Sequence, residues 1–113
     1  MKNSEYLMEV SILSTVLFAH HLHTDEEYFN SLELQEEWFL IPFHKIVVKA
    51  INHNKAKNEP IYEEFIADSL SIRGQLDFAL WTTIISANPF SKVLFEKYLE
   101  TLKKPKTSLY YEV

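Results

Sequence analysis

The chain has 113 residues, which fits one domain, because domains cluster at roughly 100–150 residues. Apolar residues make up 47% of the sequence, which is enough material for a hydrophobic core, and the lack of cysteine excludes disulfides, thiolate zinc sites and cysteine nucleophiles. The net charge of −5 argues against direct nucleic-acid binding, since phosphate contacts need a basic face. A single glycine argues against sheets and phosphate-binding loops, and it favours helices.

Apolar side chains at helical spacing predict six helices. They are expected to cover residues 4–18, 24–32, 42–51, 60–73, 77–87 and 90–103. Ser4 and Asp77 are the expected N-caps of the first and fifth helices, and Thr24–Glu27 forms a capping box for the second. The polar stretch Asn52–Asn58 is expected to be a turn, and Gly74 is expected to end the fourth helix in the left-handed conformation.

The sequence therefore predicts an all-α fold, a compact orthogonal bundle of about six helices. A head domain is expected over residues 1–104 and a C-terminal tail over residues 105–113. Because the N-terminus is a poor signal peptide and no apolar run approaches the roughly 20 residues needed to span a bilayer, a cytoplasmic location without membrane contact is expected. The fourth helix is expected to carry Ile61, Phe65, Ile66 and Leu70 on one side, and the fifth to carry Leu80, Trp81, Ile84 and Ile85. The inward positions of the sixth are expected to be Leu94, Phe95, Tyr98, Leu99 and Leu102.

The motifs of common catalytic sites are missing from the sequence. It has no glycine-rich nucleotide loop, no zinc-protease motif and no nucleophile elbow, so we expect no enzyme activity, no NTPase activity and no cofactor. The cluster His20, His21 and His23 is the one candidate for metal binding, because His20 and His23 would share a helix face. The alternative is an exposed polar helix end, and a metal protein that also uses His44 and His53 remains open.

Direct nucleic-acid binding remains a further alternative. Four lysines in and after the third predicted helix would form a local basic strip, and they are Lys45, Lys49, Lys55 and Lys57. The acidic balance of the whole chain argues against this reading.

A series of short motifs follows in a fixed order along residues 5–103. Its parts are Glu9 before Ile12-Leu13, then Glu37-Trp38-Phe39, Pro42-Phe43-His44, Asn58-Glu59-Pro60-Ile61-Tyr62, Leu70, Gly74, Leu76, Pro89 and Tyr98. This order resembles the N-terminal domain of DnaB-type replicative DNA helicases. The chain departs from that family at Ser14 and Asn58, where the family has glycine, and at Tyr62, where it has aspartate. It also lacks the helical hairpin that follows this head in the family.

The resemblance implies a non-catalytic domain that associates with itself in the collar of the helicase ring and contacts primase or a helicase loader. The ATPase of that family lies in a separate domain, so the chain is either a fragment of a helicase or a stand-alone relative. The alternative function is a free-standing regulator that binds helicase or primase. The resemblance implies self-association through the last helix, where the candidate interface residues are Phe90, Leu94, Phe95, Tyr98 and Leu102. The same stripe also fits an interior position.

Overall fold

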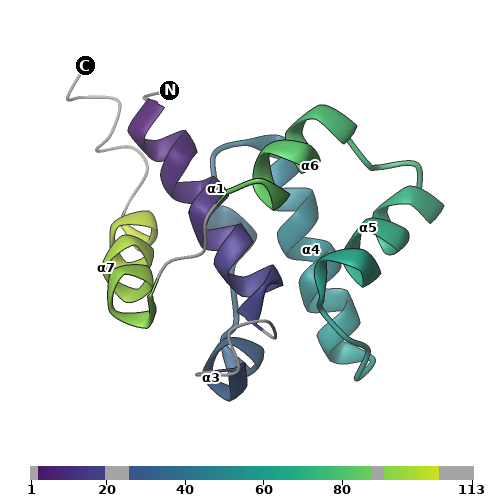
Figure 1. Cartoon of the computed structure of the whole chain (residues 1–113), viewed down its shortest axis with the longest axis horizontal. Coiled ribbons are helices and arrows are strands. Elements are labelled where there is room, and N and C mark those ends of the chain that lie inside the picture. Colours follow the sequence, from purple (N-terminus) through teal and green to yellow (C-terminus); the bar gives the residue numbers. More distant parts are fainter. Residues whose placement is uncertain (1–2, 20–25, 88–90, 105–113) are drawn as a thin grey trace.

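The computed structural model describes residues 3–19, 26–87 and 91–104. These ranges contain helices and no strand, so the predicted all-α fold is confirmed (Figure 1). The elements are α1 (Asn3–Leu17), α3 (Glu26–Ser31), a short 3-10 helix η1 (Glu36–Trp38), α4 (Pro42–Ala56), α5 (Glu63–Ile72), α6 (Phe78–Ile85) and α7 (Lys92–Lys103). The radius of gyration is 13.6 Å, close to the roughly 13 Å of a compact 100-residue domain.

Helix α1 lies at the centre of the bundle, as its wide apolar arc predicts. It contacts α4, α6 and α7, and Figure 1 shows it running between α7 on one side and α4 on the other. Its buried apolar residues cover about half of the helix circumference, and they are Val10, Ile12, Leu13, Val16 and Leu17; buried Ser14 and Thr15 fill most of the remaining directions. A helix that is buried on most sides needs neighbours on most sides, which explains its position.

Two predicted helix starts need correction, and two predicted caps are confirmed. Helix α1 begins at Asn3, so Ser4 lies within the helix and is not its N-cap. Helix α5 begins at Glu63, three residues after Pro60, because Tyr62 is still extended at the N-cap. Asp77 caps α6 as predicted, since its Oδ1 accepts a hydrogen bond from the backbone N–H of Leu80 at 3.1 Å. Gly74 takes the predicted left-handed conformation, with φ of +67°.

The polar stretch Asn52–Asn58 was expected to be a turn, and most of it is helical instead. Helix α4 continues to Ala56, because two asparagine side chains bind carbonyl groups outside the helix and leave its backbone ladder intact. Asn52 Nδ2 donates to the Leu34 carbonyl and Asn54 Nδ2 donates to the Pro60 carbonyl, each at 2.9 Å. The chain turns only at Asn58, whose φ is +57°.

The remaining sequence predictions divide between the core and the surface. On α5, Ile66 and Leu70 are buried, but Phe65 is 43% exposed, so its assignment to the same side is wrong, and on α6 Ile85 of the predicted apolar set is 37% exposed. Phe65 precedes Ile66 by one residue and therefore points about 100° away from it. The histidine cluster, the Thr24 capping box, Pro89, Phe90 and the tail 105–113 lie outside the described residues.

Candidate functional site

The predicted interface on α7 is divided between the interior and the edge of the bundle. Phe95 and Leu102 are buried, so in this fold they are core residues that a partner cannot reach. Leu94 and Tyr98 are half-buried, and Phe90 lies outside the described residues. The apolar side chain of α7 that faces solvent is Val93, which is 81% exposed and which the sequence reasoning did not name.

Contacts with the first half of the chain hold the inner side of α7. Phe95 meets Phe29 edge to face, with ring centroids 4.9 Å apart. Near the two ends of the helix, Lys92 Nζ lies 4.5 Å from the ring centroid of Tyr28 and Lys103 Nζ lies 5.1 Å from that of Trp38. The inner side of α7 therefore belongs to the fold, and only its outer side is free for assembly.

A buried carboxylate on α1 meets a buried imidazole on α4. Glu9 and His44 are both fully buried, and His44 Nδ1 lies 2.8 Å from Glu9 Oε1. Two backbone groups just before α4 also donate to this carboxylate: the N–H of Leu40 to Oε2 at 2.8 Å and the N–H of Ile41 to Oε1 at 3.4 Å. The carboxylate therefore joins the middle of α1 to the start of α4.

The contact with Glu9 determines which ring nitrogen of His44 donates a hydrogen bond. Because the carboxylate is an acceptor, His44 donates from Nδ1, and its Nε2 meets no hydrogen-bond partner in the described structure. The ring of Tyr6 contacts the imidazole of His44, with the two ring centroids 5.7 Å apart. With both groups fully buried, this arrangement is built to hold two helices together and gives a dissolved substrate no access.

Glu9 and His44 were each named from the sequence as parts of separate motifs, but their contact was not foreseen. They lie 35 residues apart, and nothing in either local pattern connects them. His53, the other described histidine, is half-buried near the end of α4. Among the described residues, no group of three or more histidine, aspartate or glutamate side chains is placed to hold a metal ion, and the cluster His20, His21 and His23 lies outside them.

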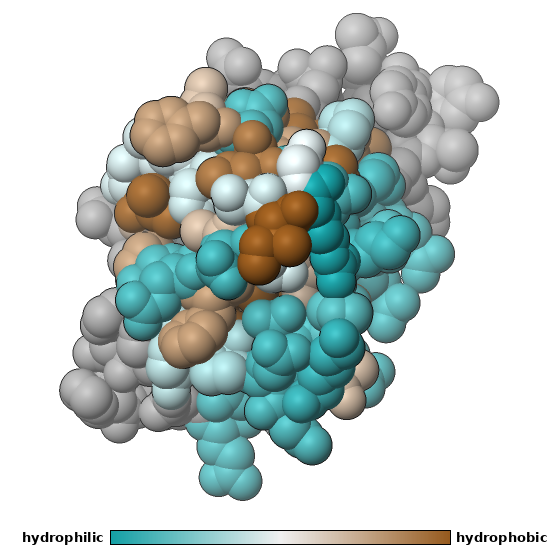
Figure 2. Space-filling view, turned by 90° about the vertical axis from the view of Figure 1, so that its right-hand side faces the viewer, coloured by the Kyte–Doolittle hydropathy of each residue, from teal (hydrophilic) through white to brown (hydrophobic). Residues whose placement is uncertain are grey.

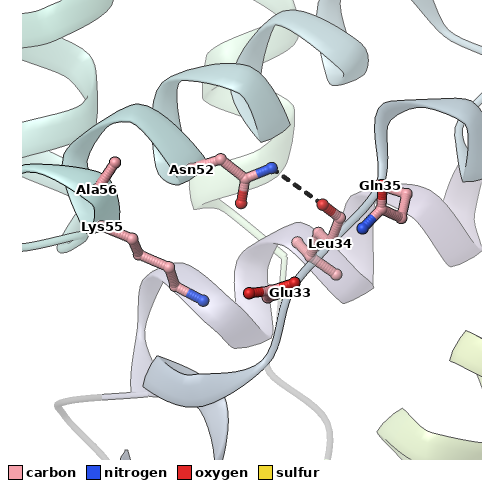
Figure 3. Close-up of a pocket in the computed structure, with 6 residues that line it drawn as sticks. All are labelled: Glu33, Leu34, Gln35, Asn52, Lys55 and Ala56. Atoms are coloured by element: carbon pink, nitrogen blue, oxygen red, sulfur yellow. Dashed lines mark hydrogen bonds between the residues drawn. The ribbon is translucent and has the colours of Figure 1, made fainter.

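A shallow hollow of about 390 Å³ lies between α4 and the segment that follows α3 (Figure 3). Lys55 Nζ donates to the carbonyl of Leu32, and it lies 3.5 Å from that of Phe29. Burial lowers the pKa of Lys55, and the nearby carboxylate of Glu33, toward which Figure 3 shows the ammonium directed, partly opposes that shift. Together with the Asn52 amide on the Leu34 carbonyl, these contacts tether the end of α3 to α4.

Several large apolar side chains remain exposed on α5 and α6. Ile72 is 78% exposed, Phe78 is 75% exposed, and Phe65 lies on the same side of α5 as Ile72, seven residues earlier. Figure 2 shows this side of the molecule, where hydrophobic groups reach the surface between hydrophilic ones. Phe65 and Ile72 border a hollow of about 240 Å³ between α5 and the end of α4.

In comparisons with known proteins, no family model, no curated protein and no solved structure matches the chain. Over the described residues, none of the helices combines the length and the apolar character that crossing a membrane requires.

Proposed function

We propose that the chain is an assembly and partner-docking domain of a replicative DNA helicase. It associates with itself in the collar of the ring and contacts primase or a helicase loader. The observation that carries the proposal is the exposure of large apolar side chains on four helices, and the most exposed of them are Ile72, Phe78 and Val93. Exposed apolar groups of this size favour contact with another protein surface.

Residues that carry the resemblance to the helicase family have structural roles in this fold, and these roles support the proposal. Glu9 and His44, from two separate motifs, form one buried contact. Asn58 stands where the family has glycine, and its φ of +57° is a conformation that glycine adopts freely and asparagine tolerates.

The departure at Ser14 is also accommodated in the structure. Ser14 is buried in α1, and its hydroxyl donates to the carbonyl of Ala87, just after α6, at 3.0 Å. A small side chain with a satisfied hydroxyl still permits α1 and α6 to lie in contact. The substitution of the family's glycine is therefore compatible with the proposed fold relationship.

The test is the mass of the purified chain in solution over a range of concentrations, by light scattering and sedimentation. We expect a reversible dimer or higher oligomer that Val93→Glu weakens, because it places a charge on the exposed side of α7. Thr83→Glu, on the exposed side of α6, is the matched control and leaves the mass unchanged.

Binding to purified primase and purified helicase loader completes the test. We expect one of the two to bind, and we expect no ATP hydrolysis by the chain alone. A monomer at every concentration that nevertheless binds helicase would favour the free-standing regulator, and ATP turnover would overturn the proposal.

A further inference from the structure

We propose that the groove between α4 and α5 binds an acidic amphipathic helix of a partner protein. The inference rests on the proposed docking function and names the partner class and the surface. Its apolar floor is the hollow bordered by Phe65 and Ile72, and its basic side is formed by His53 of α4 and the C-cap residue Lys57, which line the hollow, and is extended by Lys49, four residues before His53.

The apolar part of the groove has the spacing of a helix-binding site. Phe65 and Ile72 are seven residues apart, so they lie on one side of α5 and about 10.5 Å apart along its axis. This distance matches two anchor positions, i and i+7, on a helix laid along the groove. Between them the hollow offers about 240 Å³, room for apolar side chains of the bound helix.

The basic part of the groove comes from an unusual helix in an acidic chain. The segment 42–57 contains four lysines and no aspartate or glutamate, although the whole chain carries a net charge of −5. Lys49, His53 and Lys57 follow one another at intervals of four residues, so they form a row about 12 Å long on one side of α4.

The two lysines of this row take part in no ion pair within the described structure. Lys49 and Lys57 are exposed and form no ion pair with another described residue, whereas Lys45 and Lys55 donate to backbone carbonyls. Arg73 adds a further cation where the hollow meets the end of α5. Carboxylates at intervals of three or four residues on one flank of a bound helix would face this row.

Two carboxylates at the same hollow favour a peptide over a nucleic acid. Glu59 and Asp68 line the hollow together with His53, Lys57 and Arg73. The two carboxylates repel negatively charged groups of a ligand from their part of the surface. A nucleic acid carries charge uniformly along its backbone and would meet both carboxylates. An amphipathic helix carries its charge on one flank only, and it can place acidic groups on the α4 side and apolar groups over Phe65 and Ile72.

The test uses fluorescein-labelled synthetic peptides and fluorescence anisotropy with the full chain. The probe is an 18-residue helix former with leucine at i, i+3 and i+7 and glutamate on one flank. Its controls are a peptide of the same pattern with lysine in place of glutamate and a scrambled acidic peptide. We expect the acidic amphipathic peptide to bind at least tenfold more tightly than either control, and its affinity to fall as salt rises.

Variants of the chain locate the binding surface. Ile72→Ser is expected to weaken binding about tenfold, while Phe78→Ser, an equally exposed apolar position outside the hollow, leaves it unchanged. Lys57→Glu is expected to weaken binding severalfold and to reduce its salt dependence, while Lys97→Glu on α7 does neither. Far-UV circular dichroism confirms that each variant is folded.

Three results of the peptide assay would each overturn the inference: equal binding of the lysine peptide, equal losses for Ile72→Ser and Phe78→Ser, and displacement of the peptide by a single-stranded oligonucleotide. Two results that involve self-association bear on it as well. Loss of self-association on Ile72→Ser would assign the groove to a second copy of the chain and would also reject the acidic partner. If peptide binding fails while self-association through Val93 persists, only the inference falls; if both fail, the proposed function falls with it.

Discussion

Replacing Glu9 by leucine removes the acceptor that three donors share in the interior of the bundle. The part-buried Leu40 N–H and the fully buried His44 Nδ1–H, each 2.8 Å from the carboxylate, would lose their acceptor. Each such donor left without an acceptor costs about 1–3 kcal/mol, so the two together cost about 2–6 kcal/mol. The Ile41 N–H, at 3.4 Å, adds little. We therefore expect Glu9→Leu to lower the free energy of unfolding by about 2–6 kcal/mol.

The assay is urea unfolding followed by circular dichroism and by the fluorescence of the buried Trp81. With a slope of about 1–3 kcal/mol per molar urea, the loss moves the midpoint down by about 2 M. A domain has only about 5–15 kcal/mol to lose, so Glu9→Gln provides a milder second variant. It keeps one acceptor oxygen and is expected to cost less than Glu9→Leu. Glu64→Leu, an exposed carboxylate on α5, is the matched control and should stay within about 0.5 kcal/mol.

A double-mutant cycle with His44→Leu separates this contact from general damage to the core. The double variant no longer contains the orphaned imidazole, so we expect it to be less destabilised than the sum of the single variants by about 1–3 kcal/mol. Strict additivity, or a cost below about 1 kcal/mol for Glu9→Leu, would refute the view that this carboxylate joins α1 to α4.

Four further predictions concern single positions in the fold. At the left-handed position Gly74, substitution by alanine should cost about 1–2 kcal/mol through backbone strain alone, since nothing lies within 4 Å of an added Cβ. At the left-handed position Asn58, substitution by glycine should be neutral or slightly stabilising. Equal effects of the two variants in urea unfolding would contradict this. Ser14→Ala should cost about 1 kcal/mol for one lost hydrogen bond and Ser14→Gly about 1 kcal/mol more for lower helix propensity, and a stabilised glycine variant would argue against it. Burial, with smaller contributions from nearby glutamates, raises the pKa of Tyr28. The folded state therefore holds that proton more tightly than the unfolded state and loses stability as the pH rises above 10.0. Tyr28→Phe should lose less stability between about pH 9 and 11, and an equal loss would contradict this. The lowered pKa of Lys55 acts with the opposite sign, because stability is gained as the pH rises from that lowered value to 10.5, and Lys55→Met should abolish this gain in the same urea series.

The resemblance drawn from the sequence named several positions that have clear structural roles, but the sequence did not reveal most of those roles. The role of Gly74 could be predicted, because the left-handed end of a helix is a local property that one glycine can indicate. Asn58 was seen as a departure from glycine, and its positive φ appears only in the folded backbone. The sequence left open whether Phe95 and Leu102 belong to a partner interface or to the interior, because an inward stripe and an interface stripe have the same spacing; in the fold both side chains are buried.

The sequence by itself determined the helical class, the approximate positions of the helices and the cap at Asp77. These follow from residues within one or two turns of each other, where periodicity and capping act. Only the tertiary structure decided that Glu9 meets His44, that Phe65 faces outward, and that α4 continues through Asn52. Such contacts depend on how helices distant in sequence pack against each other, and no local pattern contains that information.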